Sequence, residues 1–446
     1  MIDQVLTKYM KEKNSWSIDS YLSHQGYEAA KKALDLKPDE VVETVKKSNL
    51  RGRGGAGFPT GMKWSFMPKE AKDKDGNLKP KYLVCNADEG EPGTFKDRLI
   101  MTRNPHALIE GMIIAGHAIG AKCGYIYIRG EFFKEAMMVK LAIKEACEKG
   151  YLGKNIFGTN YSFDLYIYRG AGAYICGEET ALLNSLEGKR GEPRLKPPFP
   201  AQAGAFGMPT CVNNVETFAS VPYIILNGPE KFAVMGTERS GGTRLFCVSG
   251  HVTRPGVYEL PINIKLSDLI DHCGGVRDGK KLKAVIPGGA SAPMLRADEI
   301  DVCMDFDSLA KAGTMAGSGG VIVMDETTCI VEATSILLRF YEHESCGQCS
   351  QCREGSHWLA RMYHRIENGG GTNLDLDIIA QICSNMAGQT ICAFADAVTG
   401  PALSSVRKFR EEFEAHVKMK GCPLKTHKNH TVNQNYSIAH SGVGHV

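Results

Sequence analysis

The cysteines toward the end of this sequence are the residues whose types and spacing point most directly to chemistry. Cys346, Cys349 and Cys352 recur every three residues, and Cys392 follows as a lone fourth candidate. Because the sequence shows no export signal, we expect reduced thiols that bind a metal or a cluster rather than disulfides. A Cys-x-x-Cys-x-x-Cys run completed by a distant cysteine is typical of a four-iron cluster, whereas structural zinc sites more often show two separated Cys-x-x-Cys pairs. The pattern favours an iron–sulfur cluster over zinc, and zinc over free thiols.

Cys383 competes with Cys392 for the fourth ligand position. Cys383 lies inside an apolar helical pattern, whereas Cys392 follows a break at Ala387 and Gly388 and is therefore freer in its orientation. Arg353, beside the cysteine run, would stabilise thiolates. We interpret the cysteines without ligand spacing as small core residues, namely Cys85, Cys123, Cys147, Cys211, Cys247, Cys273, Cys303, Cys329 and Cys422.

A glycine-rich segment at 51–61 is the first candidate for ligand binding. It contains five glycines and matches G-x-G-x-x-G, but a helical pattern precedes it where the dinucleotide fingerprint requires a strand. A Walker A motif is excluded because no Gly-Lys-Ser or Gly-Lys-Thr follows. We expect a loop whose backbone N–H groups approach a phosphate, with Arg53 and Lys63 as positive charges. The alternative is a plain flexible turn.

Polar residues follow two predicted strands. The strand at 82–85 leads into Asn86, Asp88, Glu89 and Glu91, at the edge of a sheet where open α/β folds bind ligands. Asn86 and Asp88 could equally form Asx turns. A second strand, at 163–168, leads through a glycine turn into a helix at 178–186, an arrangement suited to a nucleotide. The carboxylates that begin this helix would suit sugar hydroxyls or an amide, or act simply as partners of the helix dipole.

The order of elements predicts three structural units. At 446 residues the chain is long enough for about three domains. Alternating strands and helices predict an α/β unit. The short strands after about residue 241 predict a small β-grasp-like unit that is structural or a docking surface. The helical pattern after residue 332 predicts a bundle that holds the cluster. The predicted helices of this bundle are 333–341, 357–367, 376–386 and 400–418. The expected boundaries are 1–240, 241–330, 331–420 and a flexible tail at 421–446.

Charge and hydropathy limit the possible partners. The net charge of +3 is too small to predict nucleic-acid binding. The most apolar window, 107–121, is interrupted by Glu110 and His117 and is shorter than the roughly 20 residues that span a bilayer. We therefore expect a cytoplasmic protein without direct membrane insertion. The segment after Ala415 holds five of the 13 histidines; we interpret it as a solvated tail, with metal capture as the alternative.

Five motifs, in this order, resemble the 51 kDa flavoprotein subunits of respiratory NADH:quinone oxidoreductase, complex I. They lie at 51–61, 85–98, 170–182, 213–217 and 344–355. The resemblance extends from about residue 49 to residue 418. It implies an α/β fold in which a Rossmann-like FMN- and NADH-binding domain is followed by a β-grasp (ubiquitin-like) domain and a helical bundle that carries an iron–sulfur cluster.

The resemblance also implies the roles of individual residues. The FMN site would be formed by Gly52, Arg53, Gly54, Gly55, Lys63, Asn86, Asp88, Glu89, Gly177, Glu178, Asn213 and Asn214. The adenine of NADH would lie between Phe58, Phe66 and Phe199, and its nicotinamide and ribose would contact Glu91, Glu179 and Lys196. One 4Fe-4S cluster would be bound by Cys346, Cys349, Cys352 and Cys392, which resolves the choice against Cys383.

The implied activity is oxidation of NADH. Hydride would pass to FMN, so that no protein acid or base is required, and single electrons would pass through the cluster and partner subunits to quinone. The implied partners are a thioredoxin-like 2Fe-2S subunit and a large iron–sulfur subunit, which would hold the chain at the inner face of the cell membrane. The alternatives are a diaphorase subunit of an NAD-linked hydrogenase or formate dehydrogenase, and a non-catalytic scaffold that carries a cluster.

Overall fold

The first unit is built on a parallel four-stranded sheet. The computed structural model describes residues 4–424, so most of the expected tail lies outside the described residues. The strand order is β3-β2-β1-β4, and every neighbouring pair is parallel. The strands are β1 (Tyr82–Ala87), β2 (Cys123–Ile128), β3 (Asp164–Arg169) and β4 (Thr210–Asn214). β4 was not predicted from the sequence, because its second half consists of two asparagines that belong to a candidate binding motif.

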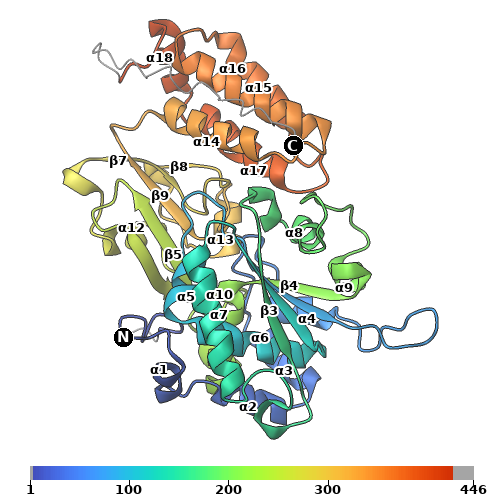
Figure 1. The fold of residues 1–446 in the computed structure, drawn as a ribbon. Helices are drawn as coiled ribbons and strands as arrows, with labels where there is room; N and C mark the ends of the chain where they lie inside the picture. Colours follow the sequence, from blue (N-terminus) through green and yellow to red (C-terminus); the bar gives the residue numbers. More distant parts are fainter. Residues whose placement is uncertain (1–3, 425–446) are drawn as a thin grey trace, which may run out of the picture.

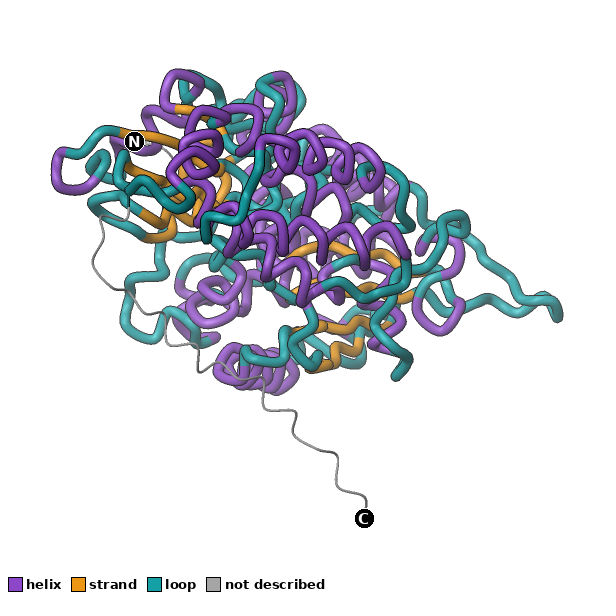
Figure 2. The backbone as a smooth tube through the Cα atoms, turned by 90° about the horizontal axis from the view of Figure 1, so that it is seen from above, coloured by secondary structure: helices purple, strands orange, loops and turns teal. Residues whose placement is uncertain are grey.

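Helices surround this sheet, as Figure 1 shows. The helices before the first strand are α1 (Ile18–Ser23), α2 (Glu28–Asp35), α3 (Pro38–Lys47) and α4 (Thr60–Ser65). Those that connect or follow the strands are α5 (Asp97–Arg103), α6 (Pro105–Ile119), α7 (Phe133–Glu148), α8 (Glu179–Leu186), α9 (Pro200–Ala203), α10 (Val215–Asn227) and α11 (Pro229–Ala233). A long loop between α4 and β1 projects from the body of the molecule in Figures 1 and 2.

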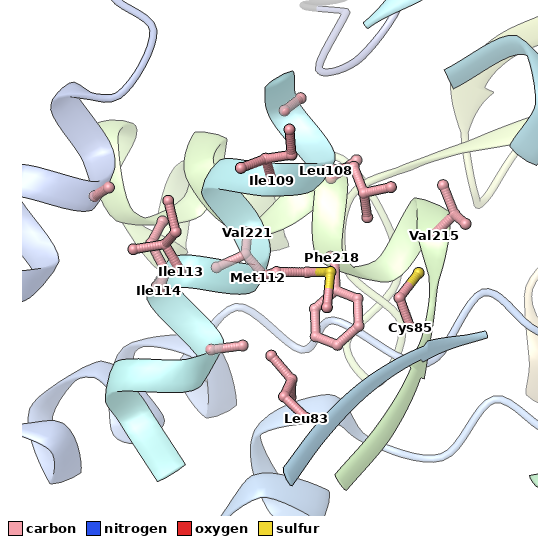
Figure 3. Close-up of a cluster of buried hydrophobic side chains, with 14 of the residues drawn as sticks. Leu83, Cys85, Leu108, Ile109, Met112, Ile113, Ile114, Val215, Phe218 and Val221 are labelled. Carbon is pink, nitrogen blue, oxygen red and sulfur yellow. The ribbon is translucent and has the colours of Figure 1, made fainter. Parts of the chain in front are cut away.

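The core of this unit lies between α6, α10 and β1. Figure 3 shows Met112 of α6, Phe218 of α10 and Leu83 of β1 converging there, and all three are fully buried. A Cβ atom on Gly111 would lie 1.9 Å from the carbonyl oxygen of Phe218, so only glycine allows the two helices to approach this closely. The apolar window at 107–121 is therefore a core helix. None of the helices within residues 4–424 is both long and apolar enough to cross a membrane.

The second unit contains a mixed five-stranded sheet in the order β6-β5-β9-β7-β8. Its first and last strands, β5 and β9, pair in parallel at the centre, as expected of a β-grasp, and the other pairs are antiparallel. The strands are β5 (Thr243–Gly250), β6 (Gly256–Pro261), β7 (Leu282–Ile286), β8 (Leu295–Arg296) and β9 (Gly320–Asp325), and the helices are α12 (Leu266–His272) and α13 (Phe306–Lys311).

The third unit is helical and forms the orange layer of Figure 1. It consists of α14 (Ile330–Glu344), α15 (Ser350–Glu367), α16 (Asn373–Met386), α17 (Phe394–Lys408) and α18 (Arg410–Met419). The single helix predicted at 400–418 is wrong, because the buried Phe409 leaves the helical conformation, with φ −128° and ψ 33°, and separates α17 from α18. His416, expected in the solvated tail, lies in α18 and is fully buried. The predicted fold class is confirmed.

Candidate active site

A cavity of about 540 Å³ lies where the three units meet. The α/β unit contributes the glycine loop and the carboxyl ends of β1 and β4, the place where open α/β sheets bind ligands. The β-grasp unit contributes Ser291, Thr314 and Ser318, and the helical unit contributes Cys392 and Phe394. The cavity volume is within the usual range for cofactor sites. The β-grasp unit was expected to be only structural or a docking surface, whereas its loops form part of this wall.

The structure brings most of the FMN residues expected from the resemblance to this cavity. Its wall includes Arg53, Gly54, Gly55, Asn86, Asp88, Glu89, Gly177, Glu178 and Asn214. Gly52, Lys63 and Asn213 lie outside the wall; the Oδ1 atom of Asn213 accepts a hydrogen bond from Trp64 Nε1 at 2.9 Å. Asn213 therefore holds α4, the helix that follows the glycine-rich segment, while Asn214 faces the cavity.

The glycine loop leaves room for a ligand. Gly55 has a φ of 138°, in the region that favours glycine, and a Cβ atom there would meet no described atom within 4 Å. A Cβ atom on Gly54 would lie 3.1 Å from the Cβ of Asn214, so a larger residue at this position would press against the Asn214 side chain. An open backbone at this position can receive the oxygens of a phosphate.

Arg53 anchors the loop from beneath. Its backbone N–H donates to Thr217 Oγ1 at 2.9 Å, and its Nη2 donates to the carbonyl oxygens of Gly241 at 2.8 Å and Thr243 at 3.0 Å. Burial lowers the pKa of Arg53 to about 10. Among the described residues, its Nε and Nη1 have no hydrogen-bond partner, and neither does Oδ2 of the cavity residue Asp88. Buried polar atoms without partners are what the wall of a polar cofactor site contains.

The acidic turn after β1 has structural roles as well as cavity positions. Asn86 Oδ1 accepts from the backbone N–H of Asp88 at 3.1 Å, which is the Asx turn considered as the alternative, and its Nδ2 donates to the carbonyl of Gly177 at 2.8 Å. The Glu89 carboxylate accepts from the backbone N–H groups that begin α5, at 2.8 and 3.2 Å. Burial raises the pKa of both Asp88 and Glu89 to about 7.

Lys96 and Asp97 line the cavity although sequence reasoning did not select them. Lys96 Nζ lies 2.8 Å from Asp97 Oδ1, 3.1 Å from Asn214 Oδ1 and 2.9 Å from Glu216 Oε2. Burial alone would lower the pKa of Lys96, but the carboxylates of Asp97 and Glu216 raise it above its ordinary value. Both residues lie inside the motif at 85–98, and this position was the only feature of the sequence that could have identified them as site residues.

The three phenylalanines expected to contact the adenine of NADH are all exposed. Phe58 and Phe66 have ring centroids 6.0 Å apart, and their side chains are 44% and 59% exposed. Phe199 is 53% exposed. Neighbouring exposed aromatic side chains such as Phe58 and Phe66 are typical of a surface that meets a ligand or partner. These rings are therefore available to stack against a planar group.

Two lysines hold the carboxylates at the start of α8. Lys63 lies 2.9 Å from Glu179, and Lys196 lies 2.9 Å from Glu178 and 3.2 Å from Glu179. Burial would raise the pKa of Glu179, but Lys63 and Lys196 lower it. Glu178 also accepts hydrogen bonds from the backbone N–H groups of Thr180 and Ala181 and so caps the helix. The helix-partner interpretation thus holds for Glu178, while Lys63 joins α4 to α8.

The cysteine run is placed against Cys392 by the turn between α16 and α17. The backbone N–H of Ile391 donates to Cys349 Sγ at 3.5 Å. Burial raises the pKa of Cys392 to about 11, and the nearby thiols of Cys346 and Cys352 contribute. Cys383 is fully buried inside α16. The structure therefore brings Cys392 to the loop of three cysteines.

The spacing of these four cysteines differs from that of a single-ion site. Within residues 4–424, the one group of three or more Cys, His, Asp or Glu side chains whose ligand atoms all lie within 4.8 Å of one another is elsewhere in the helical unit. A tetrahedral zinc needs ligand atoms about 3.3–3.8 Å apart, by its bond lengths. The wider set at 346–392 suits a cluster of several irons.

Comparison with known proteins agrees with these features. The Nuo51 FMN-binding domain matches residues 45–223, the NADH-ubiquinone oxidoreductase-F iron-sulfur binding region matches residues 332–416, and the SLBB domain matches residues 245–295. An F subunit of the NADH-quinone oxidoreductase of Rhizobium meliloti is 52% identical over 426 residues, which cover 95% of this chain and all of the relative. The chain belongs to the family of NADH-quinone oxidoreductase F subunits.

Other members of this family are similar to the same extent. The F subunit of the NADH-quinone oxidoreductase of Mycobacterium tuberculosis is 50% identical over 94% of this chain and 95% of its own length. Among solved structures, an NAD+-reducing NiFe hydrogenase in the H2-reduced state superposes with a TM-score of 0.80 at 35% identity. That match covers 92% of this chain and 66% of the hydrogenase chain. The resemblance inferred from the five motifs is confirmed, as are FMN, NADH and a 4Fe-4S cluster as cofactors.

Proposed function

We propose that this chain is the NADH-oxidising flavoprotein subunit of a respiratory NADH–quinone oxidoreductase. The observation that carries the proposal is the position of Cys392, which belongs to the cysteine set and also forms part of the wall of the cavity that contains the glycine loop. A cofactor in this cavity and a cluster on the cysteines would therefore be neighbours. When bound, FMN supplies a hydride acceptor, and the cluster supplies a one-electron acceptor.

The protein's own contribution is to bind and orient these groups. Gly55 offers open backbone to the phosphate, and Asn214 lies against Gly54 of the same loop with the Lys96 ammonium beside it. Asp88 and Glu89, with pKa values of about 7, can each hold a proton in the cavity near neutral pH. No side chain is assigned as a general acid or base, since hydride transfer to a flavin does not require one.

The NADH side of the site is assigned to exposed aromatic rings and to the charged residues at α8. Phe58, Phe66 and Phe199 would hold the adenine, because an exposed ring offers a stacking face without the loss of core packing. Glu179 and Lys196, which already form an ion pair, would exchange part of that contact for ribose hydroxyls and amide groups. Glu91, half-buried in the cavity wall between two units, completes the proposed set.

The proposed assembly places this chain in a complex with other electron carriers. Its partners would be a thioredoxin-like 2Fe-2S subunit and a large iron–sulfur subunit, and through them the chain would lie peripherally on the inner face of the cell membrane. The relatives' names support membership of a multi-subunit complex. Nucleic acid is not among the proposed partners. The domain boundaries at 240, 330 and 420 remain predictions.

A diaphorase subunit of an NAD-linked hydrogenase is the second candidate, because the superposed solved structure is such an enzyme. The chain covers all of the length of one NADH-quinone oxidoreductase relative but 66% of the hydrogenase chain. This difference favours the quinone-linked complex. NADH-dependent quinone reduction and H2-dependent NAD+ reduction by the native complex would separate the two.

The first experiment is an anaerobic titration of the purified holoprotein with NADH. We expect the flavin absorbance to bleach at about one NADH per flavin, followed by a decrease in the broad iron–sulfur absorbance. A protein in which bound flavin and cluster both ignored NADH would contradict the proposal and support a scaffold that only carries a cluster.

A further inference from the structure

A second group of metal-binding side chains lies in the helical unit, away from the cysteine run. Cys329 precedes α14, Glu367 ends α15, His416 lies in the last turn of α18 and Cys422 follows α18. The ligand atoms of these four residues all lie within 4.8 Å of one another. The sequence interpretation of Cys329 and Cys422 as plain core residues missed this arrangement, because its members come from separate elements.

The distances between these ligand atoms suit one small ion. Cys329 Sγ lies 3.3 Å from His416 Nε2 and 3.5 Å from Glu367 Oε2, and His416 Nε2 lies 3.2 Å from Glu367 Oε2. A tetrahedral ion with bonds of about 2.0–2.3 Å separates its ligand atoms by about 3.3–3.8 Å. The side chains of Cys329, Glu367 and His416 would thus need to move by only a few tenths of an ångström to bind, and Cys422 Sγ lies within 4.8 Å of all three.

Neighbouring groups orient His416 and stabilise a thiolate at Cys329. His416 Nδ1 lies 2.7 Å from the backbone carbonyl oxygen of Glu412, which can only accept, so Nδ1 carries the proton and the lone pair of Nε2 faces the group. The backbone N–H of Glu332 donates to Cys329 Sγ at 3.3 Å. Cys329 is also the N-cap of a 15-residue helix, whose dipole favours a thiolate.

The site is separate from the proposed cluster. Cys329 and Cys346 flank opposite ends of α14, a helix of 15 residues and therefore about 22 Å long. α15 likewise has Cys352 in its first turn and Glu367 at its other end. Each of these two helices thus carries a ligand of the cysteine run near one end and a member of the second group near the other.

We propose that Cys329, Glu367, His416 and Cys422 bind one zinc ion. Two thiolates, an imidazole and a carboxylate are ligands that zinc accepts, and four protein ligands make a closed, structural site rather than a catalytic one. His416 is fully buried and the Glu367 side chain is 9% exposed. The ion would tie the chain after α18 to the start of α14 and so close the helical unit.

The test is the metal content of the full-length holoprotein, prepared without a histidine tag and measured for zinc and iron together. We expect about one zinc per chain, as purified or after addition of Zn2+ and removal of loosely bound metal. Cys422→Ser, at a partly exposed position, should lower zinc at least tenfold while iron and flavin contents stay unchanged. His416→Gln should act in the same way, but it changes a buried residue and serves as the second variant.

Two controls identify the source of any zinc. Cys147→Ser changes an exposed cysteine of α7 and should leave zinc unchanged. Replacing His427, His430, His440 and His445 together by asparagine should also leave it unchanged. Loss of zinc in this last variant with retention in Cys422→Ser would overturn the proposal.

X-ray absorption at the zinc edge provides a readout that is independent of activity. We expect about two sulfur ligands at about 2.3 Å and two nitrogen or oxygen ligands at about 2.0–2.2 Å. Four sulfur ligands would assign the ion to the cysteine run instead. Absence of zinc under both conditions, or a Cys329–Cys422 disulfide found by mass and thiol titration, would equally contradict the site.

Discussion

The Glu91 carboxylate accepts two hydrogen bonds from Ser291, one from its backbone N–H and one from its Oγ, both at 2.7 Å. The other oxygen of Glu91 accepts from the hydroxyl of Tyr174 at 2.5 Å. Glu91 comes from the turn after β1, whereas Ser291 belongs to the β-grasp unit, so this contact joins two units at the cavity wall. Burial raises the pKa of Glu91.

Glu91→Ala should destabilise the junction between these two units. It leaves the part-buried donors of Tyr174 and Ser291 without an acceptor, at a cost of about 1 kcal/mol. We expect a lower Tm of the holoprotein and a higher KM for NADH. Glu70→Ala, in the exposed loop before β1, is the matched control. An unchanged Tm together with an unchanged KM would mean that the contact carries neither stability nor substrate binding.

Cys392→Ser should remove the cluster and retain the flavin. Serine lacks the thiolate that completes the set of four ligands. We expect iron per chain to fall severalfold and the reduced cluster's paramagnetic resonance signal to disappear, while flavin per chain is preserved. Cys383→Ser, in the interior of α16, should keep both. Loss of the cluster in Cys383→Ser, with retention of the cluster in Cys392→Ser, would instead identify Cys383 as the fourth ligand.

Phe58→Ala and Phe66→Ala should weaken NADH binding without affecting folding. An aromatic pair contributes about 0.5–1.5 kcal/mol beyond its buried area, so we expect KM to rise about three- to tenfold with kcat nearly constant. Because both side chains are exposed, Tm should not change. Phe133→Ala, 61% exposed on α7, is the control. If KM stayed at the wild-type value in both variants, the adenine would have to bind elsewhere.

Glu110 should make stability depend on pH. Burial raises its pKa from 4.5 to about 7, and its carboxyl contacts the Tyr21 hydroxyl and the backbone N–H of Ala30. The folded protein holds the proton on Glu110 more tightly than the unfolded chain does. The resulting contribution to the free energy of unfolding is fully present below pH 4.5 and is lost as the pH rises through 7, a change of about 3 kcal/mol.

Glu110→Gln keeps a neutral group of the same shape and should flatten that dependence. We expect its Tm to exceed that of the wild type above pH 7 and to converge with it near pH 5. Glu148→Gln, at an exposed position of α7, should follow the wild-type profile. Parallel profiles for Glu110→Gln and the wild type would show that Glu110 stays ionised in the fold.

Local spacing made part of this molecule predictable from the sequence. The cysteine run and the glycine loop are short motifs, and their residues adjoin in space because they adjoin in the chain. β4 was missed because Asn213 and Asn214 in its second half do not favour a strand, and the break at Phe409 was missed because tertiary packing overrides the local helical pattern there. Glu89 caps α5 only eight and nine residues further along the chain, but nothing in its acidic turn distinguishes a capping carboxylate from a ligand-binding one. Cys329 and Cys422 meet from elements far apart in the chain, and no local spacing in the sequence predicts such a contact.

The hydrogen bonds from Arg53 to the carbonyls of Gly241 and Thr243 limit where the gene for this protein could be divided. The loop that offers its backbone to a phosphate is fastened to the first strand of the following unit. A gene fragment that ended at residue 240 would encode the loop without the acceptors that hold its arginine in place. Recombination at that point would therefore separate a ligand loop from the backbone that supports it.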